Sequence, residues 1–324
     1  MNIEQYKEKL DLLTNELEKI DLLNADTDYK VLKQLFDTTY QSGVLDIVHL
    51  AKNLQDEFKL TLFTYLTKIS GSLSFLVIQI LAANNIMQKH NCSKKEFYTK
   101  KKCGIAINHL RVAKTIVNGV KVDCGYELSG ILTWASGYKI FDTLLIGFHH
   151  DGYEFEAMAS FSLNDGFTLG EAPATFVGNS LNTININLKN FFVKDEDIVS
   201  SNLLGNYTKQ KSASKTVHFC IYAIGNTALE KIEDEDFKKS GFEKLEKIKS
   251  DFNNSNDIDE LDNLRVELFI LSQSIVTTAM VLNGGKSILL ESYFQRLYRE
   301  LIMFNSNGLN NTLKGIFKDR FATN

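Results

Sequence analysis

Apolar residues recur along the chain with two different periods, and the period changes twice. In the first hundred residues apolar side chains come every three or four positions, which is the spacing of one face of an α-helix. The first such series is Ile3, Tyr6, Leu10, Leu13 and Leu17. A second runs through residues 31–36, and Asp26 or Thr27 is its expected N-cap. Residues 71–90 are apolar on nearly all sides, which predicts a buried helix.

Around residue 103 the pattern changes to that of strands. Short runs rich in β-branched and aromatic residues follow one another to about residue 206, separated by Gly, Asn and Asp. Such runs are typical of an antiparallel sheet or barrel. Asp151-Gly152 and Asn118-Gly119 are the expected hairpin turns, because glycine readily adopts the positive φ of a type I′ turn.

Helical spacing returns from residue 215 onward. The charged residues 230–251 indicate a solvated helix and loop, and residues 261–282 carry Leu and Ile at helical intervals before a glycine-rich C-cap. With 324 residues the chain exceeds the roughly 250 to 300 residues at which one hydrophobic core stops growing. We therefore predict an α+β protein with three domains. These are an N-terminal helical domain (1–102), a middle β domain (103–210) and a C-terminal helical bundle (211–324).

Composition narrows the class of protein. A net charge of −4, without a basic stripe, makes nucleic acid an unexpected partner. The four cysteines lack CxxC spacing, so we expect free thiols and a reducing compartment. The N-terminus has no apolar core of a signal peptide, and the longest apolar run, residues 73–83, is shorter than the ~20 residues of a membrane span. We expect a cytoplasmic protein without a membrane span.

The most informative segment for chemistry is residues 125–142, GYELSGILTWASGYKIFD. In a strand, Trp134 and Ser136 would point to the same face, because side chains alternate with period 2. That face would offer an aromatic plane and a hydroxyl donor, which suits a flat cofactor. A half-buried Trp at a strand end, followed by a turn, is the alternative interpretation.

This segment resembles the middle domain of the acyl-CoA dehydrogenase superfamily, and its Trp-x-Ser-Gly form resembles the branch of flavin-dependent monooxygenases. A second resemblance lies in residues 280–300, MVLNGGKSILLESYFQRLYRE. It is similar to the family's Gly-Gly turn and Arg-x-x-Arg-acid helix start, met here by Asn283, Gly284, Gly285, Arg296, Arg299 and Glu300. The resemblance implies helices, strands and helices in that order, and a homodimer or homotetramer.

The resemblance also implies a cofactor, FAD or FMN, held between the β domain and the bundle. Ser136 would donate a hydrogen bond near its redox centre and Trp134 would cover one face, while the flavin carries the redox chemistry. Asn283, Gly284 and Gly285 would lie near the cofactor of a neighbouring subunit, although a helix cap alone explains the glycines. The implied substrate is a hydrophobic small molecule, or one bound to an acyl carrier or CoA.

Three departures from the family's pattern bear on the chemistry. Residues 304–308 contain no carboxylate where the dehydrogenases carry their base, and only Glu230 and Glu267 are candidates on an earlier helix. The elements that hold the FAD pyrophosphate, and the Thr-Glu and Gly-Ser elements before the central strand, are also missing. Oxygen activation by a reduced flavin is therefore favoured over α,β-dehydrogenation, and FMN is as suitable as FAD. A flavin-free relative that serves as a binding or assembly partner is the competing class.

Three further residues are candidates for an active site. His109 and Arg111 share one face of an expected strand in residues 104–112, and Asn305 follows the Arg-x-x-Arg helix start. His149-His150-Asp151 offers metal-ligating residue types, but adjacent residues of a strand face opposite ways. A hairpin end is the better interpretation, and no metal site is expected.

Overall fold

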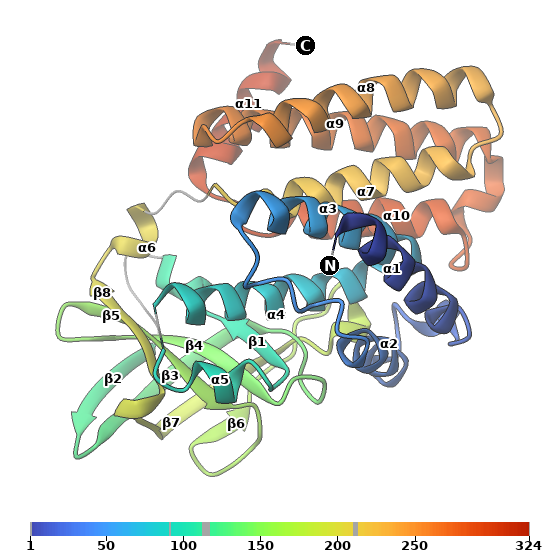
Figure 1. Cartoon of the computed structure of the whole chain (residues 1–324). Coiled ribbons are helices and arrows are strands. Elements are labelled where there is room, and N and C mark those ends of the chain that lie inside the picture. The colour runs from blue at the N-terminus through green and yellow to red at the C-terminus, as the bar shows by residue number, and fades with distance from the viewer. Residues whose placement is uncertain (1, 91, 112–116, 210–212, 324) are drawn as a thin grey trace.

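The chain begins with helices, as expected. The computed structural model describes residues 2–90, 92–111, 117–209 and 213–323 (Figure 1). Its first helices are α1 (Ile3–Leu17), α2 (Tyr29–Gln41), α3 (Lys52–Ile69), α4 (Gly71–Lys89) and the short α5 (Lys95–Tyr98). The N-cap of α2 is Asp28, whose carboxylate accepts a hydrogen bond from the Lys30 N–H at 2.8 Å. The expectation of Asp26 or Thr27 at this cap is therefore wrong, and Asp26 has a different role described below.

The middle part is one sheet with the strand order β6-β7-β3-β2-β4-β5-β8. Strand β1 lies outside this order and pairs with β4. The strands are β1 (Cys103–Ala106), β2 (Val117–Val122), β3 (Gly125–Ala135), β4 (Thr143–His150), β5 (Tyr153–Ser160), β6 (Phe167–Leu169), β7 (Ile184–Lys194) and β8 (Ile198–Leu203). Most neighbours are antiparallel, as expected, but β4 pairs in parallel with both β1 and β2. The predicted α+β class is confirmed.

One of the two predicted hairpin turns is confirmed. Asp151 and Gly152 join β4 to β5 with φ of 44° and 79°, and the residues on either side of them, His150 and Tyr153, are paired. Both central residues thus have the positive φ that a type I′ turn requires.

The other turn prediction, Asn118-Gly119, is wrong because both residues lie inside β2. Gly119 is needed there for space: a Cβ at this position would come within 2.6 Å of the Phe148 ring. The connection from β2 to β3 contains Cys124 instead, at a φ of 60°.

The C-terminal part is a helical bundle. It comprises α7 (Thr216–Lys231), α8 (Glu235–Asn254), α9 (Ile258–Leu282), α10 (Tyr293–Ser306) and α11 (Asn311–Thr323). The short α6 (Asn206–Lys209) precedes the bundle and lies at the end of β8 (Figure 1). Within the described ranges, α9 alone is long and apolar enough to cross a membrane by length and composition. It packs against α7, α8, α10 and α11, so its apolar residues serve the core of this bundle.

Helix α4 joins the sheet to the bundle. It runs between them in Figure 1 and contacts β1 on one side and α3 and α10 on the other. Most of its apolar residues, including Leu73, Leu76 and Val77, are buried, which confirms the predicted buried helix. One cluster of buried apolar side chains contains members from all three parts of the chain. The division into domains at residues 102 and 210 stays a prediction.

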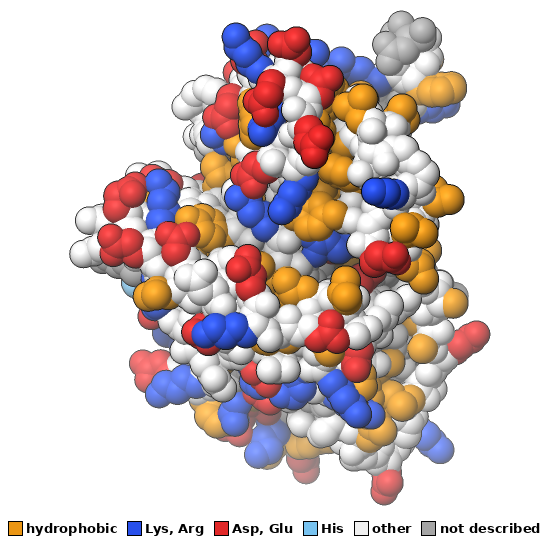
Figure 2. Space-filling view, turned by 90° about the vertical axis from the view of Figure 1, so that its right-hand side faces the viewer, with side chains coloured by type: hydrophobic (Ala, Val, Ile, Leu, Met, Phe, Trp, Pro, Cys, Tyr) orange, Lys and Arg blue, Asp and Glu red, His pale blue; other side chains and the backbone are white. Residues whose placement is uncertain are grey.

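Charged residues of both signs are spread over the surface. On the face seen in Figure 2, acidic and basic side chains are interspersed with hydrophobic ones, in keeping with the small net charge of −4. That face offers no continuous basic stripe.

Candidate cofactor and active site

The segment that carries Trp134 ends β3 with a bulge. The register between β3 and β7 shifts between Leu132 and Ala135, and Trp134 has a φ of 59°. The backbone N–H of Trp134 donates a hydrogen bond to Asn185 Oδ1 at 3.1 Å. Because the bulge interrupts the alternation of side chains, Trp134 is 56% exposed whereas Ser136 is 5% exposed. The inference that both lie on one face of a regular strand is therefore wrong.

Ser136 shares a hydrogen bond with a second hydroxyl. Its Oγ lies 2.8 Å from Thr183 Oγ1, and the adjacent Gly137 N–H donates to the Leu181 carbonyl at 2.7 Å. Each hydroxyl has one proton, and their mutual bond uses one of the two. The pair therefore retains one proton that can be donated to a ligand.

These features fit a flat cofactor. The indole, more than half exposed, offers a plane for stacking, and Thr183, the half-buried member of the hydroxyl pair, offers a donor for a ring nitrogen or oxygen. The residues that would hold such a group on this chain are Trp134, Ser136 and Thr183. Thr183 was not anticipated from the sequence.

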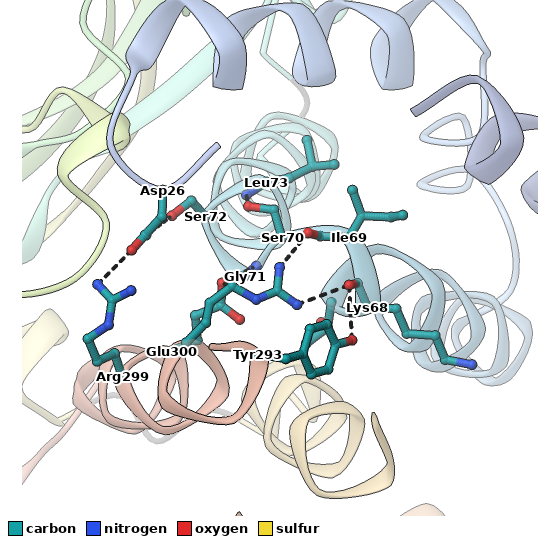
Figure 3. A network of polar contacts seen from close by, with 12 residues as sticks. Asp26, Lys68, Ile69, Ser70, Gly71, Ser72, Leu73, Tyr293, Arg299 and Glu300 are labelled. Carbon is teal, nitrogen blue, oxygen red and sulfur yellow. Dashed lines mark hydrogen bonds and ion pairs between the residues drawn. The ribbon is translucent and has the colours of Figure 1, made fainter. Parts of the chain in front are cut away.

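The Arg-x-x-Arg-acid motif at the start of α10 stabilises the break between α3 and α4 (Figure 3). The Arg296 guanidinium donates hydrogen bonds to the last carbonyls of α3, at Lys68 and Ile69. The fully buried Glu300 accepts a hydrogen bond from the first N–H of α4, at Gly71, at 2.8 Å. A cation thus lies at the C-terminus of one helix and a carboxyl group at the N-terminus of the next, as the helix dipoles favour.

Arg299 extends this network toward the sheet. It forms an ion pair of 2.7 Å with Asp26 and donates a hydrogen bond to the Phe176 carbonyl at 3.0 Å. Asp26 Oδ1 in turn accepts hydrogen bonds from the Gly178 N–H and the Ser72 hydroxyl, at 3.2 and 3.3 Å. The motif therefore anchors the N-terminal helices and the segment before β7 to α10.

His109 lies in a 3₁₀ turn, Asn108–Arg111, so the prediction that it shares a strand face with Arg111 is wrong. The side chain of Arg111 lies outside the described residues. His109 is buried, and its Nε2–H donates to the Gly147 carbonyl at 2.7 Å, since a carbonyl can only accept. Burial lowers the pKa of His109, which keeps the ring neutral at pH 7. Its Nδ1 is buried and has no hydrogen-bond partner among the described residues.

Asn305 lies near the end of α10, where the sequence lacks the family's carboxylate. The buried Arg265 of α9 donates to the carbonyls of Asn305 and Asn307, at 2.7 and 2.8 Å. The Asn305 Oδ1 is buried and has no hydrogen-bond partner among the described residues. Arg265, which the sequence patterns did not single out, therefore stabilises this end of α10.

The two alternative carboxylates are on the surface. Glu230 pairs with Lys68 at 2.8 Å and Glu267 lies 3.9 Å from Arg320, and each side chain is more than one third exposed. Neither lies in a buried site where a substrate could be enclosed beside it.

Asn283, Gly284 and Gly285 end α9, as the C-cap prediction requires. Asn283 Nδ2 donates to Ser287 Oγ at 2.9 Å, and Gly284 has a φ of 66°. A Cβ on either glycine would meet no described atom within 4 Å, so this turn faces open space on its own chain.

The histidines at the end of β4 make structural contacts. His149 Nε2 lies 3.8 Å from the buried Glu154, and burial lowers the pKa of His149. His150 Nδ1 donates a hydrogen bond to the Gly119 carbonyl at 2.9 Å. Among the described residues no group of three or more His, Cys, Asp or Glu side chains is arranged to hold a metal ion.

Comparison with known proteins gives matches by structure alone. No protein-family model and no curated protein matches the sequence. The structure is similar to butyryl-CoA dehydrogenase from Megasphaera elsdenii, with a TM-score of 0.74 and 12% identity over 98% of each chain. The chain has the acyl-CoA dehydrogenase fold.

A monooxygenase and a protein solved with a reduced flavin are also similar in structure. The HsaA monooxygenase from M. tuberculosis matches with a TM-score of 0.72 and 11% identity, over 100% of this chain and 98% of that one. XiaF from Streptomyces sp., solved in complex with FADH2 and glycerol, matches with 0.68 and 11%, over 99% and 97%. The resemblance drawn from the two sequence segments is confirmed at the level of the fold.

Within the acyl-CoA dehydrogenase fold, the candidate residues occupy separate places. Trp134 and Ser136 end β3, His109 contacts β4, and Asn305 contacts α9. The Gly284-Gly285 turn lies between α9 and α10. No hydrogen bond among the described residues connects these groups, so the structure brings together only Trp134 and Ser136, with Thr183 beside them.

Proposed function

We propose that this chain is a flavin-dependent oxidoreductase of acyl-CoA dehydrogenase type. The observation that supports it most is the half-exposed Trp134 beside the Ser136–Thr183 hydroxyl pair, in a fold shared with a structure containing FADH2. FAD or FMN would be the cofactor, and a bound flavin would supply the transfer of electrons. The substrate would be hydrophobic or acyl thioester-like, free or bound to a carrier or CoA. The protein would act in the cytoplasm as a homodimer or homotetramer.

His109 is the proposed proton acceptor. Its neutral ring holds a proton on Nε2 against the Gly147 carbonyl, which leaves Nδ1 able to take a proton from a substrate hydroxyl or thiol. Asn305 and Arg111 are proposed to contact the polar end of the substrate. Asn283, Gly284 and Gly285 would approach the cofactor of a neighbouring subunit, which their open surroundings on this chain permit.

Oxygen activation is the favoured chemistry. The end of α10 offers backbone carbonyls bonded to Arg265 where α,β-dehydrogenation needs a carboxylate, and Glu230 and Glu267 are at the surface. A reaction in which the substrate gives its proton to a neutral imidazole has no such requirement.

The first experiment is a binding titration that uses the chain's single tryptophan. Emission of the protein then reports Trp134, and stacking of FAD, FMN or their reduced forms on the indole should quench it in a saturable manner. Trp134→Ala, measured by calorimetry, should lose most of this affinity. Tyr153→Ala removes another exposed aromatic side chain of the sheet and should bind as the wild type does. A colourless protein whose emission no flavin changes would establish the competing class, a flavin-free binding or assembly protein.

His109 is tested separately. Glutamine at this position keeps a donor for the Gly147 carbonyl but has no basic nitrogen, so His109→Gln should bind flavin normally and lose turnover that depends on substrate deprotonation. Equal turnover of the variant and the wild type would exclude His109 as the proton acceptor.

A further inference from the structure

Two residues on the other side of the β3 bulge hold the Trp134–Ser136 element in place. Asn185, in β7, accepts the Trp134 N–H at 3.1 Å, and Thr183, just before β7, shares a hydrogen bond of 2.8 Å with Ser136. Between them Ile184 pairs with Ala135. Three consecutive residues of one segment thus face three consecutive residues of the other.

Asn185 is itself held from a second direction. Its backbone carbonyl accepts the Gly170 N–H at 2.8 Å, and a Cβ at Gly170 would come within 3.2 Å of the Asn185 Cβ. The backbone of Asn185 therefore has a defined position between β3 and the residue that follows β6. Trp134 has a φ of 59°, a left-handed backbone conformation that residues other than glycine rarely adopt. The hydrogen bond from its backbone N–H to Asn185 stabilises this conformation.

Thr183 is placed by contacts that run back to α10. The 3₁₀ turn Asn179–Leu181 precedes it, and the Leu181 carbonyl accepts the Gly137 N–H at 2.7 Å. Asn182 Nδ2 donates to the Tyr138 carbonyl at 2.7 Å. Before the turn, Phe176 and Gly178 are bonded to the Arg299–Asp26 pair of Figure 3. The backbone before Thr183 is therefore anchored both to the residues after Ser136 and to α10.

We propose that Thr183 and Asn185 complete the cofactor site, an inference that rests on the proposed function. Asn185 is a positioning residue that holds the backbone of Trp134 in the bulge and so fixes where the indole leaves the chain. Thr183 is the second half of a hydroxyl pair whose one remaining proton is donated to the cofactor. Because Ser136 is buried and Thr183 is only half-buried, Thr183 is the member that contacts the ligand.

The role of Asn185 is tested without any cofactor. Asn185→Leu removes the acceptor at similar volume, and it should lower the fluorescence anisotropy of Trp134 and raise its quenching by acrylamide. Asn185→Asp keeps a carboxylate oxygen for the Trp134 N–H and should behave as the wild type does. Asn187→Leu, two residues along the same strand, is the matched control, because its side chain donates to the Leu169 carbonyl and does not contact Trp134. Unchanged anisotropy in Asn185→Leu would overturn this part of the proposal.

The role of Thr183 is tested with FMN and FAD on the full chain. Thr183→Val removes only the hydroxyl, and it should weaken flavin binding about three- to ten-fold, as expected for one lost hydrogen bond, and change the midpoint potential of the bound flavin. Thr183→Ser should restore both quantities. Ser136→Ala should weaken binding less than Thr183→Val does, and Thr168→Val, an exposed threonine of β6, should change neither.

The outcomes separate this inference from the proposed function. A wild type that binds flavin, with Thr183→Val showing the same affinity and potential, would refute the role of Thr183 alone. A wild type that binds neither FAD nor FMN, oxidised or reduced, would refute the proposed function and with it the role of Thr183. The fluorescence anisotropy of Trp134 in the Asn185 variants tests in either case whether Asn185 positions Trp134, because that measurement needs no flavin.

Discussion

The contact between Gly71 and Glu300 allows a quantitative test of how α10 holds the α3–α4 break. A Cβ at Gly71 would lie 2.5 Å from Glu300 Cδ and 2.8 Å from Cγ, closer than atoms can approach, so Gly71→Ala must displace the carboxyl group. Overpacking of this kind costs about 1 to 3 kcal/mol, and losing the 2.8 Å hydrogen bond costs about 1 kcal/mol or more. We expect Gly71→Ala to lower the free energy of unfolding by about 3 kcal/mol.

Glu300→Ala alone should also be destabilising by about 3 kcal/mol, because it removes a fully buried side chain and leaves the Gly71 N–H without its acceptor. In the double variant, however, the new Cβ of residue 71 enters the space that the carboxyl group has left. The substitution at Gly71 should then cost close to nothing. The coupling free energy between the two positions is thus expected to be about 2 to 3 kcal/mol, well above the 0.3 to 0.5 kcal/mol error of additivity.

The measurement is urea unfolding of the wild type, both single variants and the double variant. It is followed by far-UV circular dichroism and by the emission of Trp134, which reports the sheet. Glu300→Gln combined with Gly71→Ala is the control, because glutamine keeps the atoms that the new Cβ would meet and the two effects should add. If Gly71→Ala and Glu300→Ala were additive within 0.5 kcal/mol, the argument from the close approach would be refuted.

Three other positions give independent predictions. Burial lowers the pKa of His218 to about 4, against about 6.5 in the unfolded chain. Between these pH values only the unfolded state takes up a proton. The free energy of unfolding should therefore fall by about 3 kcal/mol as the pH decreases from 6.5 to 4. His218→Gln, which keeps a donor for the Leu261 carbonyl, should flatten this pH dependence in denaturant midpoints, and an unchanged slope would contradict the assignment. Gly152→Ala should lower the free energy of unfolding by about 1 kcal/mol through the φ of 79° alone, since no described atom lies within 4 Å of the Cβ position. Gly315→Ala in α11 should be neutral or stabilising in the same unfolding assay. Of the four cysteines only Cys124 is exposed, so a thiol reagent should modify one group rapidly in the native protein and none in Cys124→Ser; rapid modification of two or more would show that the buried cysteines are accessible.

Local spacing was sufficient to predict α1, α4 and α9, although not α3 (Lys52–Ile69). α1, α4 and α9 begin or end within a few residues of the positions expected from apolar periodicity, because each buries a continuous face along its length. The hairpin at Asp151-Gly152 was predictable for a similar reason, since the turn conformation is decided by the two residues themselves.

Tertiary contacts account for the predictions that were wrong. Asn118-Gly119 has the composition of a turn, yet the glycine makes room for the Phe148 ring within β2. Asp26 has the residue type of an N-cap but is paired with Arg299, a residue 273 positions later whose proximity no local pattern can indicate.

The candidate site was predictable only in part, for the same reason. The alternating Asn and Ile of β7 indicate that amides line one face of a strand, but which amide meets Trp134 depends on the register and on the bulge. Thr183 gave no signal of its own, because its hydroxyl gains meaning only from Ser136 across the bulge.

The dependence of the α3–α4 break on α10 has a consequence for biosynthesis. Glu300 follows Gly71 by 229 residues, so at about 5 to 20 residues per second the ribosome adds it roughly 10 to 45 s later. Throughout that interval the nascent chain contains an apolar helix, α4, whose first amide and the preceding carbonyls have no protein partner. The α3–α4 break can therefore gain its native hydrogen bonds only after α10 has been synthesised.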